Sequence, residues 1–351
     1  MATSTFNGAD GNDRDAAIRA TDDDAALARL SAVQCGYLVD RYAAAFVHAR
    51  HPPRRPPLIN RGTYARITAF DRVLGHWLSV LASTSTSGPA QVVSLGAGTD
   101  TRYLRFAERA ANADNNDGDM AAAVWARVRY FEVDLPKTVL RKVSAMRKAA
   151  RTTMGPQLLP DPAFDAKTTT YTAGALTITA GDLRDWPTVP RRLAELGFDP
   201  RLPTLVMAEC VLVYVDPPSA VDTMLQWIAA TCRDVVVASY DHIQPEDAFG
   251  RMMVANLRSR GIELPGLHAF PSLDAHQRRY LENGGAGFTS AQVWDMNGVW
   301  RDWVSEDEKE RIAKLEMLDE VEELQLLFAH YCLSIAARGP IGSEVVKLGG
   351  T

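Results

Sequence analysis

Two glycines directly follow a short apolar run in the stretch VVSLGAGTDTRYLRF, residues 92–106. Gly96 and Gly98 permit a tight turn and a close approach of the backbone to a ligand. The dinucleotide-binding fingerprint asks for a third glycine at position 101, where this chain has Thr101. A negative Asp100 beside the turn is a poor neighbour for a pyrophosphate. The turn alone is a weak signal, and it favours a cationic or zwitterionic ligand over NAD.

Acidic side chains follow the next three apolar runs. Asp134, in FEVDLP, is placed to accept both hydroxyls of a ribose. Asp182, in ITAGDLRDW, can accept from an adenine amino group with Leu183 beside it, and Glu209 ends the run in MAECVLVYVDP. Each acid alone is explained equally well by helix capping. Because parallel strands end at one edge of a sheet, the four positions together predict a site for a nucleoside without phosphates, which S-adenosylmethionine fits.

These positions require a sheet whose strands alternate with helices. The runs that indicate strands are residues 91–95, 128–133, 175–180, 204–208 and 234–239. Helical periodicity covers 137–150 and 219–232, and HYCLSIAAR indicates a last strand. Continuous Val, Ile and Leu runs between helices are typical of parallel strands covered on both faces. The predicted fold class is therefore α/β, a doubly wound, Rossmann-like sheet.

One domain with an N-terminal helical elaboration accounts for the chain. We expect a disordered tail over 1–20, a helical cap over 21–88, a Rossmann-like core over 89–340 and a tail over 341–351. Within the cap, helical spacing runs over 22–49 and 64–81. Two stretches fit the alternation poorly, and we interpret 112–119 and 152–170 as loop insertions in the core.

Composition excludes several classes of function. The 351 residues carry a net charge of −5, with no basic stripe for nucleic acid. No apolar run approaches the length of a membrane span, and the N-terminus lacks the apolar core of a signal peptide, so we expect a cytoplasmic protein. The four cysteines and seven histidines form no metal-ligand pattern. No additional apolar stripe indicates a dimer, so we expect a monomer.

Six stretches, in order and spacing, resemble the leucine carboxyl methyltransferase family in its fungal type. They are INRGTYARITAFDRVL, VVSLGAGTDTRYLRF, YFEVDLPKTVLRK, GDLRDW, PTLVMAECVLVYVDP and KLEMLDEVEELQLLFAHYCLSIAARG. The combination is far more specific than a class I methyltransferase glycine turn. The resemblance implies an S-adenosylmethionine-dependent enzyme that methylates the C-terminal leucine α-carboxylate of the catalytic subunit of type 2A protein phosphatases.

The resemblance also assigns roles to single positions in the methionine half of the site. It implies that Arg66 binds the methionine carboxylate and that Glu209 faces the methionine amino group. Gly96 would lie behind the methionine, and Asp134 would bind the ribose. These assignments agree with charge, because a zwitterion needs a cation for its carboxylate and acids for its ammonium. The alternative for Arg66 is an exposed arginine of a surface helix.

Four further positions complete the implied site. Asp182 and Leu183 would hold the adenine. Arg29 falls where the family carries a basic residue, often lysine, that closes over the cofactor. Tyr214, in VLVYVDP, would line the channel for methyl transfer, and a core tyrosine explains it equally well.

The implied reaction needs no general base. A peptide α-carboxylate has an unperturbed pKa of roughly 3.3–3.7 and is ionised at neutral pH. The sequence accordingly shows no Ser/His/Asp or Cys/His arrangement. Carboxylate and sulfonium charges cancel in the transition state, so a dry site favours transfer. The N-terminal helices and the loop over 261–271 are the expected enclosure.

Two other interpretations stay open. A related tRNA-hypermodifying carboxyl methyltransferase shares the fold but carries a large β-propeller region, for which we expect no room in 351 residues. A phosphatase-binding protein without catalysis is the second. The sequence has a contact position for every part of the cofactor, which weighs against a non-catalytic protein.

Overall fold

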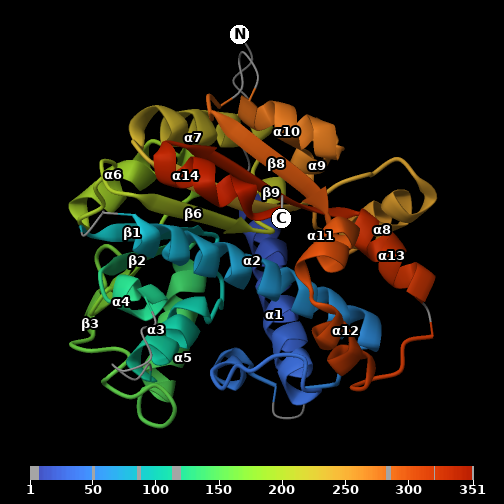
Figure 1. The fold of residues 1–351 in the computed structure, drawn as a ribbon, viewed down its shortest axis with the longest axis horizontal. Helices are drawn as coiled ribbons and strands as arrows, with labels where there is room; N and C mark the ends of the chain where they lie inside the picture. The colour runs from blue at the N-terminus through green and yellow to red at the C-terminus, as the bar shows by residue number, and fades with distance from the viewer. Residues whose placement is uncertain are drawn as a thin grey trace.

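A nine-stranded sheet forms the centre of the computed structural model, which describes residues 8–49, 52–84, 88–112, 120–281, 286–319 and 321–349. Its strands are β1 (Ala90–Leu95), β2 (Val128–Asp134), β3 (Ala163–Asp165), β4 (Thr170–Ala173), β5 (Leu176–Ala180), β6 (Thr204–Glu209), β7 (Val235–His242), β8 (Ser290–Asp295) and β9 (Tyr331–Arg338). Their order across the sheet is β3-β4-β5-β2-β1-β6-β7-β9-β8 (Figure 1).

Five parallel strands make up the core of this sheet, in the order β5-β2-β1-β6-β7. Gln91 of β1 lies opposite Arg129 of β2 and Thr204 of β6. The chain passes from β1 to β2 and later returns to the other side of β1 with β6, so the strand order reverses at β1. Open α/β sheets bind ligands at this reversal. The predicted doubly wound, Rossmann-like fold is confirmed.

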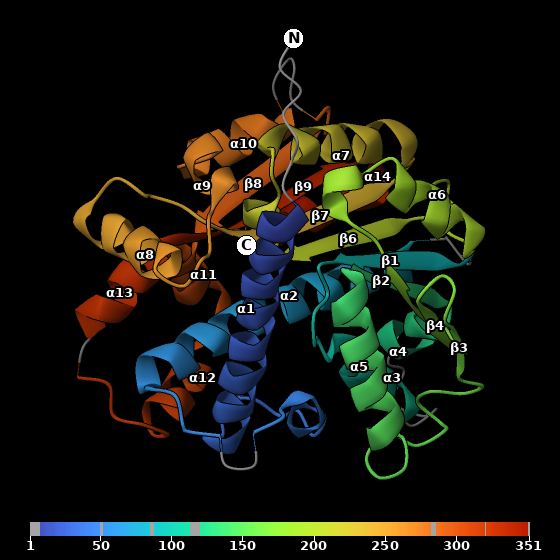
Figure 2. The same ribbon diagram turned by 180° about the vertical axis from the view of Figure 1, so that it is seen from behind.

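Helices cover both faces of the sheet (Figures 1 and 2). One face carries α2 (Pro57–Ser83), α3 (Arg102–Asn112), α4 (Met120–Trp125), α5 (Pro136–Ala149), α11 (Met296–Trp303), α13 (Val321–Ala329) and α14 (Pro340–Val345). The other carries α6 (Thr188–Glu195), α7 (Pro218–Thr231) and α10 (Leu273–Leu281). The remaining helices are α1 (Gly8–Gln34), α8 (Ala248–Arg258), α9 (Pro265–Ala269) and α12 (Glu306–Ala313), with short 3-10 turns η1 (Ala43–Phe46), η2 (Leu183–Asp185), η3 (Leu212–Tyr214) and η4 (Val346–Gly349).

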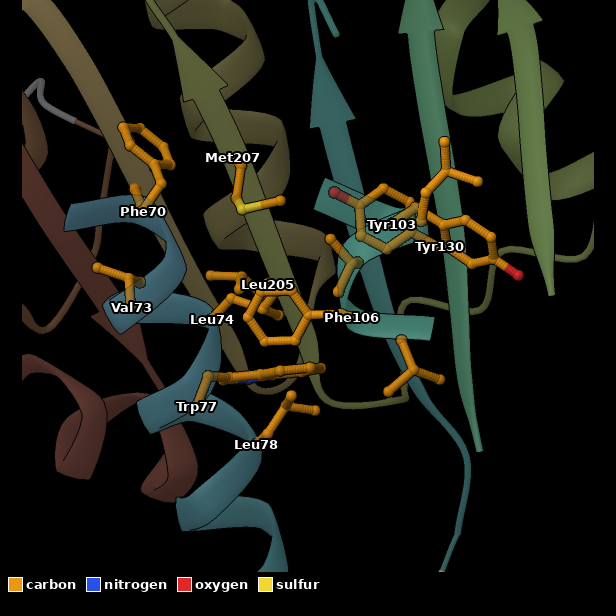
Figure 3. Close-up of a cluster of buried hydrophobic side chains, with 14 of the residues drawn as sticks. Phe70, Val73, Leu74, Trp77, Leu78, Tyr103, Phe106, Tyr130, Leu205 and Met207 are labelled. Atoms are coloured by element: carbon orange, nitrogen blue, oxygen red, sulfur yellow. The ribbon is translucent and has the colours of Figure 1, made fainter. Parts of the chain in front are cut away.

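Helix α2 lies directly on the sheet. Phe70, Leu74 and Trp77 recur at helical spacing and pack against Leu205 of β6 and Phe106 of α3 (Figure 3). All three α2 side chains are 1% exposed or less. This apolar stripe fixes the rotation of α2 about its axis, and with it the direction in which its polar residues point.

The N-terminal helix begins earlier than predicted. We expected a disordered tail through residue 20, but α1 starts at Gly8, and Figure 2 shows it lying between α5 and α8. Arg14 pairs with Asp216 at 2.6 Å, and Asp15 pairs with Arg184 at 2.9 Å. The tail prediction is wrong for residues 8–20, because these tertiary ion pairs offset a weak local helix preference. Residues 1–7 lie outside the described residues.

The C-terminal end is also ordered where we expected a tail. Residues 340–349 form α14 and η4, and Val345 is fully buried. The backbone N–H groups of Ile341 and Gly342 donate to the Asp234 carboxylate at 3.1 and 3.0 Å. The prediction is wrong for this segment, because its apolar side chains complete the core under α2.

The two expected insertions differ in outcome. Most of 112–119 lies outside the described residues. The 152–170 stretch contains β3 and the first residue of β4, which extend the sheet antiparallel beyond β5. None of the helices in the described part of the chain is long and apolar enough to cross a membrane.

Candidate active site

A cavity of about 540 Å³ opens at the carboxyl ends of β1, β2, β5 and β6. Its wall includes all eight residues that the sequence singled out: Arg29, Arg66, Gly96, Asp134, Asp182, Leu183, Glu209 and Tyr214. The cavity lies where the strand order reverses, the expected place for a ligand in this fold. The tertiary structure therefore brings together every predicted site residue.

The glycine turn after β1 forms the floor of the cavity. Gly96 and Gly98 have φ angles of 60° and 45°, which favour glycine. A Cβ atom at Gly96 would overlap the side chain of Val211, and one at Gly98 would overlap the carboxylate of Asp22. Both glycines are needed because two other parts of the chain pack directly on this turn.

Asp134 is hydrogen-bonded to the same turn. Its carboxylate accepts from the backbone N–H groups of Gly98 at 2.7 Å and Leu135 at 2.6 Å. Burial raises the pKa of Asp134, and these hydrogen bonds oppose that effect. The Thr138 side chain is a third hydrogen-bond partner of this carboxylate. A carboxylate has about four lone-pair sites, so about one remains for a ligand hydroxyl.

Asp182 caps the short turn η2. Its carboxylate accepts from the backbone N–H of Arg184 at 2.9 Å and from the Arg184 side chain, which also binds Asp15 of α1. Burial opposes ionisation, but the hydrogen bonds from Arg184 outweigh it and lower the pKa of Asp182. Leu183 follows it and is buried. The capping role is present in the structure, and the adenine contact stays a prediction.

Glu209 and Arg66 form an ion pair in the cavity wall. The Nε atom of Arg66 lies 2.9 Å from Oε1 of Glu209. Arg66 comes from the middle of α2, and its guanidinium carbon lies 6.0 Å from the centre of the Tyr240 ring. Burial disfavours its charge, but the Glu209 carboxylate outweighs burial and raises the pKa of Arg66. Arg66 is therefore a cavity residue and not an exposed helix arginine.

Arg102 is a site residue that sequence reasoning missed. It is 1% exposed and donates to Glu209 at 3.1 Å, to Asp71 at 2.8 Å and to Asp100. Arg105 joins the network through Asp71. The sequence feature that could have indicated Arg102 is the group of three charged residues just after the glycine turn, in GTDTRYLR. Only the tertiary structure shows that Arg102 points inward and holds Glu209 in place.

The expectation for Asp100 needs correction. We expected the negative charge of Asp100 to be a poor neighbour for a pyrophosphate. Burial alone would raise the pKa of Asp100, but Arg102 beside it lowers that pKa to about 2. Its carboxylate also accepts from the Arg102 backbone N–H at 3.0 Å, capping α3. Because Arg102 neutralises Asp100, this residue gives no argument against a phosphate.

Tyr214 lies in η3, shortly after Glu209. Its hydroxyl is 3.8 Å from the Cys210 sulfur, and it lines the cavity with 9% of its surface exposed. Cys210 has a φ of 55°, which is rare for a residue other than glycine. Such strain is often held at functional sites. The positive φ of Cys210 turns the chain sharply between Glu209 and Tyr214.

Helix α1 closes one side of the cavity. Asp22 accepts from the backbone N–H and the hydroxyl of Thr99, both at 2.8 Å, and also pairs with Arg141 of α5. Arg29 donates to the Thr99 carbonyl at 2.7 Å. The sequence predicted the position of Arg29, but it missed Asp22, which joins α1 to the glycine turn.

The loop over 261–271 does not provide the expected enclosure. No residue of this loop belongs to the described cavity wall. Leu264 and Leu267 pack with Val213 and Tyr214 instead. The loop supports η3 from behind, because its apolar side chains are buried there. Arg260, which precedes it, is the nearest contributor to the wall and pairs with Asp24 of α1.

The chemistry of the wall suits an organic zwitterion. Within the described residues, no group of three or more His, Cys, Asp and Glu side chains could hold a metal ion, and the four cysteines are free. A cation and an acid lie at one end of the wall, and two further carboxylates lie beyond the glycine turn. This donor set matches an amino acid joined to a nucleoside.

Comparison with known proteins identifies the family. The model of the leucine carboxyl methyltransferase family matches residues 4–229. Leucine carboxyl methyltransferase 1 of Aspergillus fumigatus is 36% identical over 96% of this chain and 86% of that protein, and the protein of the same name from Schizosaccharomyces pombe is 31% identical over 94% and 97%. The human tRNA wybutosine-synthesizing protein 4 is 33% identical over 94% of this chain and 45% of that protein. The resemblance seen in the sequence is confirmed, and this chain belongs to the leucine carboxyl methyltransferase family.

Proposed function

We propose that this protein transfers the methyl group of S-adenosylmethionine to the C-terminal leucine α-carboxylate of the catalytic subunit of type 2A protein phosphatases. The observation that carries the proposal is the cavity itself, which gathers all eight predicted residues at the edge of the sheet. Membership of the family supports the same reaction.

The wall offers a partner for each part of the cofactor. Arg66 would bind the methionine carboxylate and Glu209 the ammonium, while the backbone at Gly96 leaves room behind them. Asp134 retains a lone pair for a ribose hydroxyl, and Asp182 would hold the adenine. When bound, S-adenosylmethionine supplies an electrophilic methyl group on a positively charged sulfur.

The protein's task is to position the acceptor carboxylate and to exclude water. That carboxylate is ionised at neutral pH, so the chain needs no residue to remove a proton. Arg66 and Tyr214 both line the cavity, and we assign the positioning of the acceptor carboxylate to them. Helix α1, held by Asp22 and Arg29, keeps water out of the site, which strengthens the electrostatic preference for transfer.

Methyl incorporation from labelled S-adenosylmethionine into a purified phosphatase catalytic subunit tests the proposal. We expect incorporation into the intact subunit and none into a subunit lacking its terminal leucine. Methylation of a modified tRNA instead would favour the other activity of the family's relatives. Calorimetric titration with S-adenosylhomocysteine and with NAD tests the cofactor separately, and tight binding of NAD alone would contradict it.

A further inference from the structure

The cavity wall next to Arg66 includes a row of aromatic rings. Tyr240, next to Arg66, stacks on Tyr331 with ring centres 5.1 Å apart, and Tyr331 contacts the His242 ring at 4.5 Å. Tyr240 and His242 belong to β7, and His242 lies opposite Tyr331 of the antiparallel strand β9. All three line the cavity.

His242 is the unexplained polar group of this row. It is 3% exposed, and its Nδ1 atom is buried with no hydrogen-bond partner among the described residues. Burial, aided by the charge of Arg66, lowers the pKa of His242 to about 3. The ring is therefore neutral at physiological pH, with one N–H donor and one nitrogen acceptor. A buried polar group without a partner is costly, so its presence calls for an explanation.

The position of His242 along β7 indicates which part of an acceptor it meets. Side chains two residues apart share one face of a strand and are separated by roughly 7 Å. Tyr240 lies beside Arg66, and His242, the last residue of β7, lies one such step further toward the carboxyl edge of the sheet. A guanidinium has five N–H donors, so Arg66 can bind the acceptor carboxylate beside the methionine carboxylate. A peptide bound in this way would place its last peptide unit near His242.

We infer that His242 hydrogen-bonds the last peptide unit of the acceptor, and so distinguishes a protein C-terminus from a free amino acid. The inference rests on the proposed function and adds a specificity-determining residue to it. A peptide N–H and carbonyl that enter a dry cavity need partners. Among the described polar atoms of this row, Nδ1 of His242 is the one that is buried without a partner, and a neutral imidazole can serve either group. A free amino acid would bring an ammonium in place of this amide.

A phosphatase catalytic subunit with a ligated C-terminal peptide tests this inference. One form carries the natural amide between its last two residues, and the other carries an ester there. The ester has no N–H and a weaker carbonyl acceptor. A hydrogen bond donated by the peptide would be lost, and one accepted by it would be weakened. We expect the wild-type protein to methylate the amide form about 3- to 10-fold more efficiently, by kcat/KM, as the loss of one neutral hydrogen bond implies.

Variants of His242 complete the test. His242→Phe and His242→Leu should reduce the amide-to-ester ratio to below about twofold, while His242→Gln, which retains a donor and an acceptor, should preserve it. The ratio is internal to each variant, so it does not depend on the folded fraction. The matched control is His276→Gln, because His276 is also buried with an unpartnered Nδ1 and lies outside the described cavity wall. That control should keep the wild-type ratio.

The outcomes separate this inference from the proposed function. If the wild-type protein fails to methylate the amide form, the proposed function is wrong. If it methylates amide and ester equally well, the role of His242 is wrong and the proposed function stands. An unchanged ratio in folded His242→Phe also overturns the inference. Affinity for S-adenosylhomocysteine should stay within about twofold in every His242 variant, since the ring is assigned to the acceptor and not to the cofactor.

Discussion

The Nε atom of Arg66 lies 2.9 Å from Oε1 of Glu209, although one residue comes from the N-terminal cap and the other from the end of β6. Arg102 holds the second oxygen of the same carboxylate at 3.1 Å. The two residues that we assign to the carboxylate and the ammonium of one ligand thus neutralise each other. Removing Glu209 would leave Arg66 without its ion-pair partner, whereas Glu209 would keep Arg102 if Arg66 were removed.

Arg66 should be indispensable for turnover. Lysine keeps the charge of Arg66 but cannot form two parallel hydrogen bonds to a carboxylate. We expect Arg66→Lys to fold and lose most methylation, and Arg66→Ala to lose all of it. The assay is methyl incorporation at saturating cofactor, with thermal melting as the folding control. Arg61→Ala, on the same helix but outside the described cavity wall, should remain active. Near-normal turnover by Arg66→Ala would refute the role.

Asp182 should matter for cofactor affinity. If its carboxylate accepts from the adenine, Asp182→Ala should weaken binding of S-adenosylhomocysteine on the order of tenfold, as the loss of a charge-assisted hydrogen bond implies. Asp185, an exposed acid of the same turn, provides the control, and Asp185→Ala should bind normally. Calorimetry gives both dissociation constants. An unchanged constant in folded Asp182→Ala would leave Asp182 as a helix cap alone.

The attachment of α1 should control cofactor release. Asp22 joins α1 to Thr99 and to Arg141, whereas the exposed Asp23 reaches only Arg141 among the described residues. We expect Asp22→Ala to speed dissociation of S-adenosylhomocysteine on the order of tenfold, because it removes charge-assisted hydrogen bonds. Asp23→Ala should change the rate less than about twofold, as for an exposed ion pair. Equal rates in the two variants, measured by stopped flow, would contradict a closing role for α1.

The Arg102 network should dominate local stability. Arg102→Met removes the ion-pair partner of Asp100, while Glu209 keeps Arg66 and Asp71 keeps Arg105. Asp100 is then left with an unpaired buried charge, so we expect the free energy of unfolding to fall by about 3–5 kcal/mol. Arg301 forms an ion pair with Asp302 while 72% of its side chain is exposed, and Arg301→Met should cost less than about 0.5 kcal/mol. Denaturant unfolding measures both. Equal losses would show that the buried pairs add nothing.

His276 should make the fold sensitive to acid. Burial, with the charge of Arg279 added, lowers the pKa of His276 to about 3, whereas an unfolded histidine titrates near 6.5. Between these values the unfolded chain binds a proton that the folded chain does not. Stability is therefore complete above pH ~6.5 and falls toward pH ~3 by about 1.4 kcal/mol per unit.

His276→Gln should abolish this part of the pH dependence. As the pH decreases, the free energy of unfolding should therefore fall more steeply for the wild-type protein than for the variant. Parallel curves of unfolding free energy against pH would show that His276 is not buried as a neutral ring.

Much of the sheet and the cavity floor could be predicted from the sequence. Parallel strands buried on both faces read as continuous apolar runs, and five such runs fall on β1, β2, β5, β6 and β7. Polar residues directly after these runs must meet at one edge, so Asp134, Asp182 and Glu209 could be placed without coordinates. The edge strands β3 and β8 and the four-residue strand β4 escaped prediction, because none of them carries a comparable apolar run.

The sequence by itself determined the fold class, the edge of the sheet where a ligand binds and the residue types that face it, because each depends on local periodicity and chain order. Only the tertiary structure decided that α1 closes over the glycine turn, that Arg102 supports Glu209 and that His242 meets Tyr331. The hydrogen bond from Thr99 to Asp22 joins residues 77 positions apart. Such contacts depend on which faces of distant elements bury each other, and that choice minimises the free energy of the whole chain rather than of any segment.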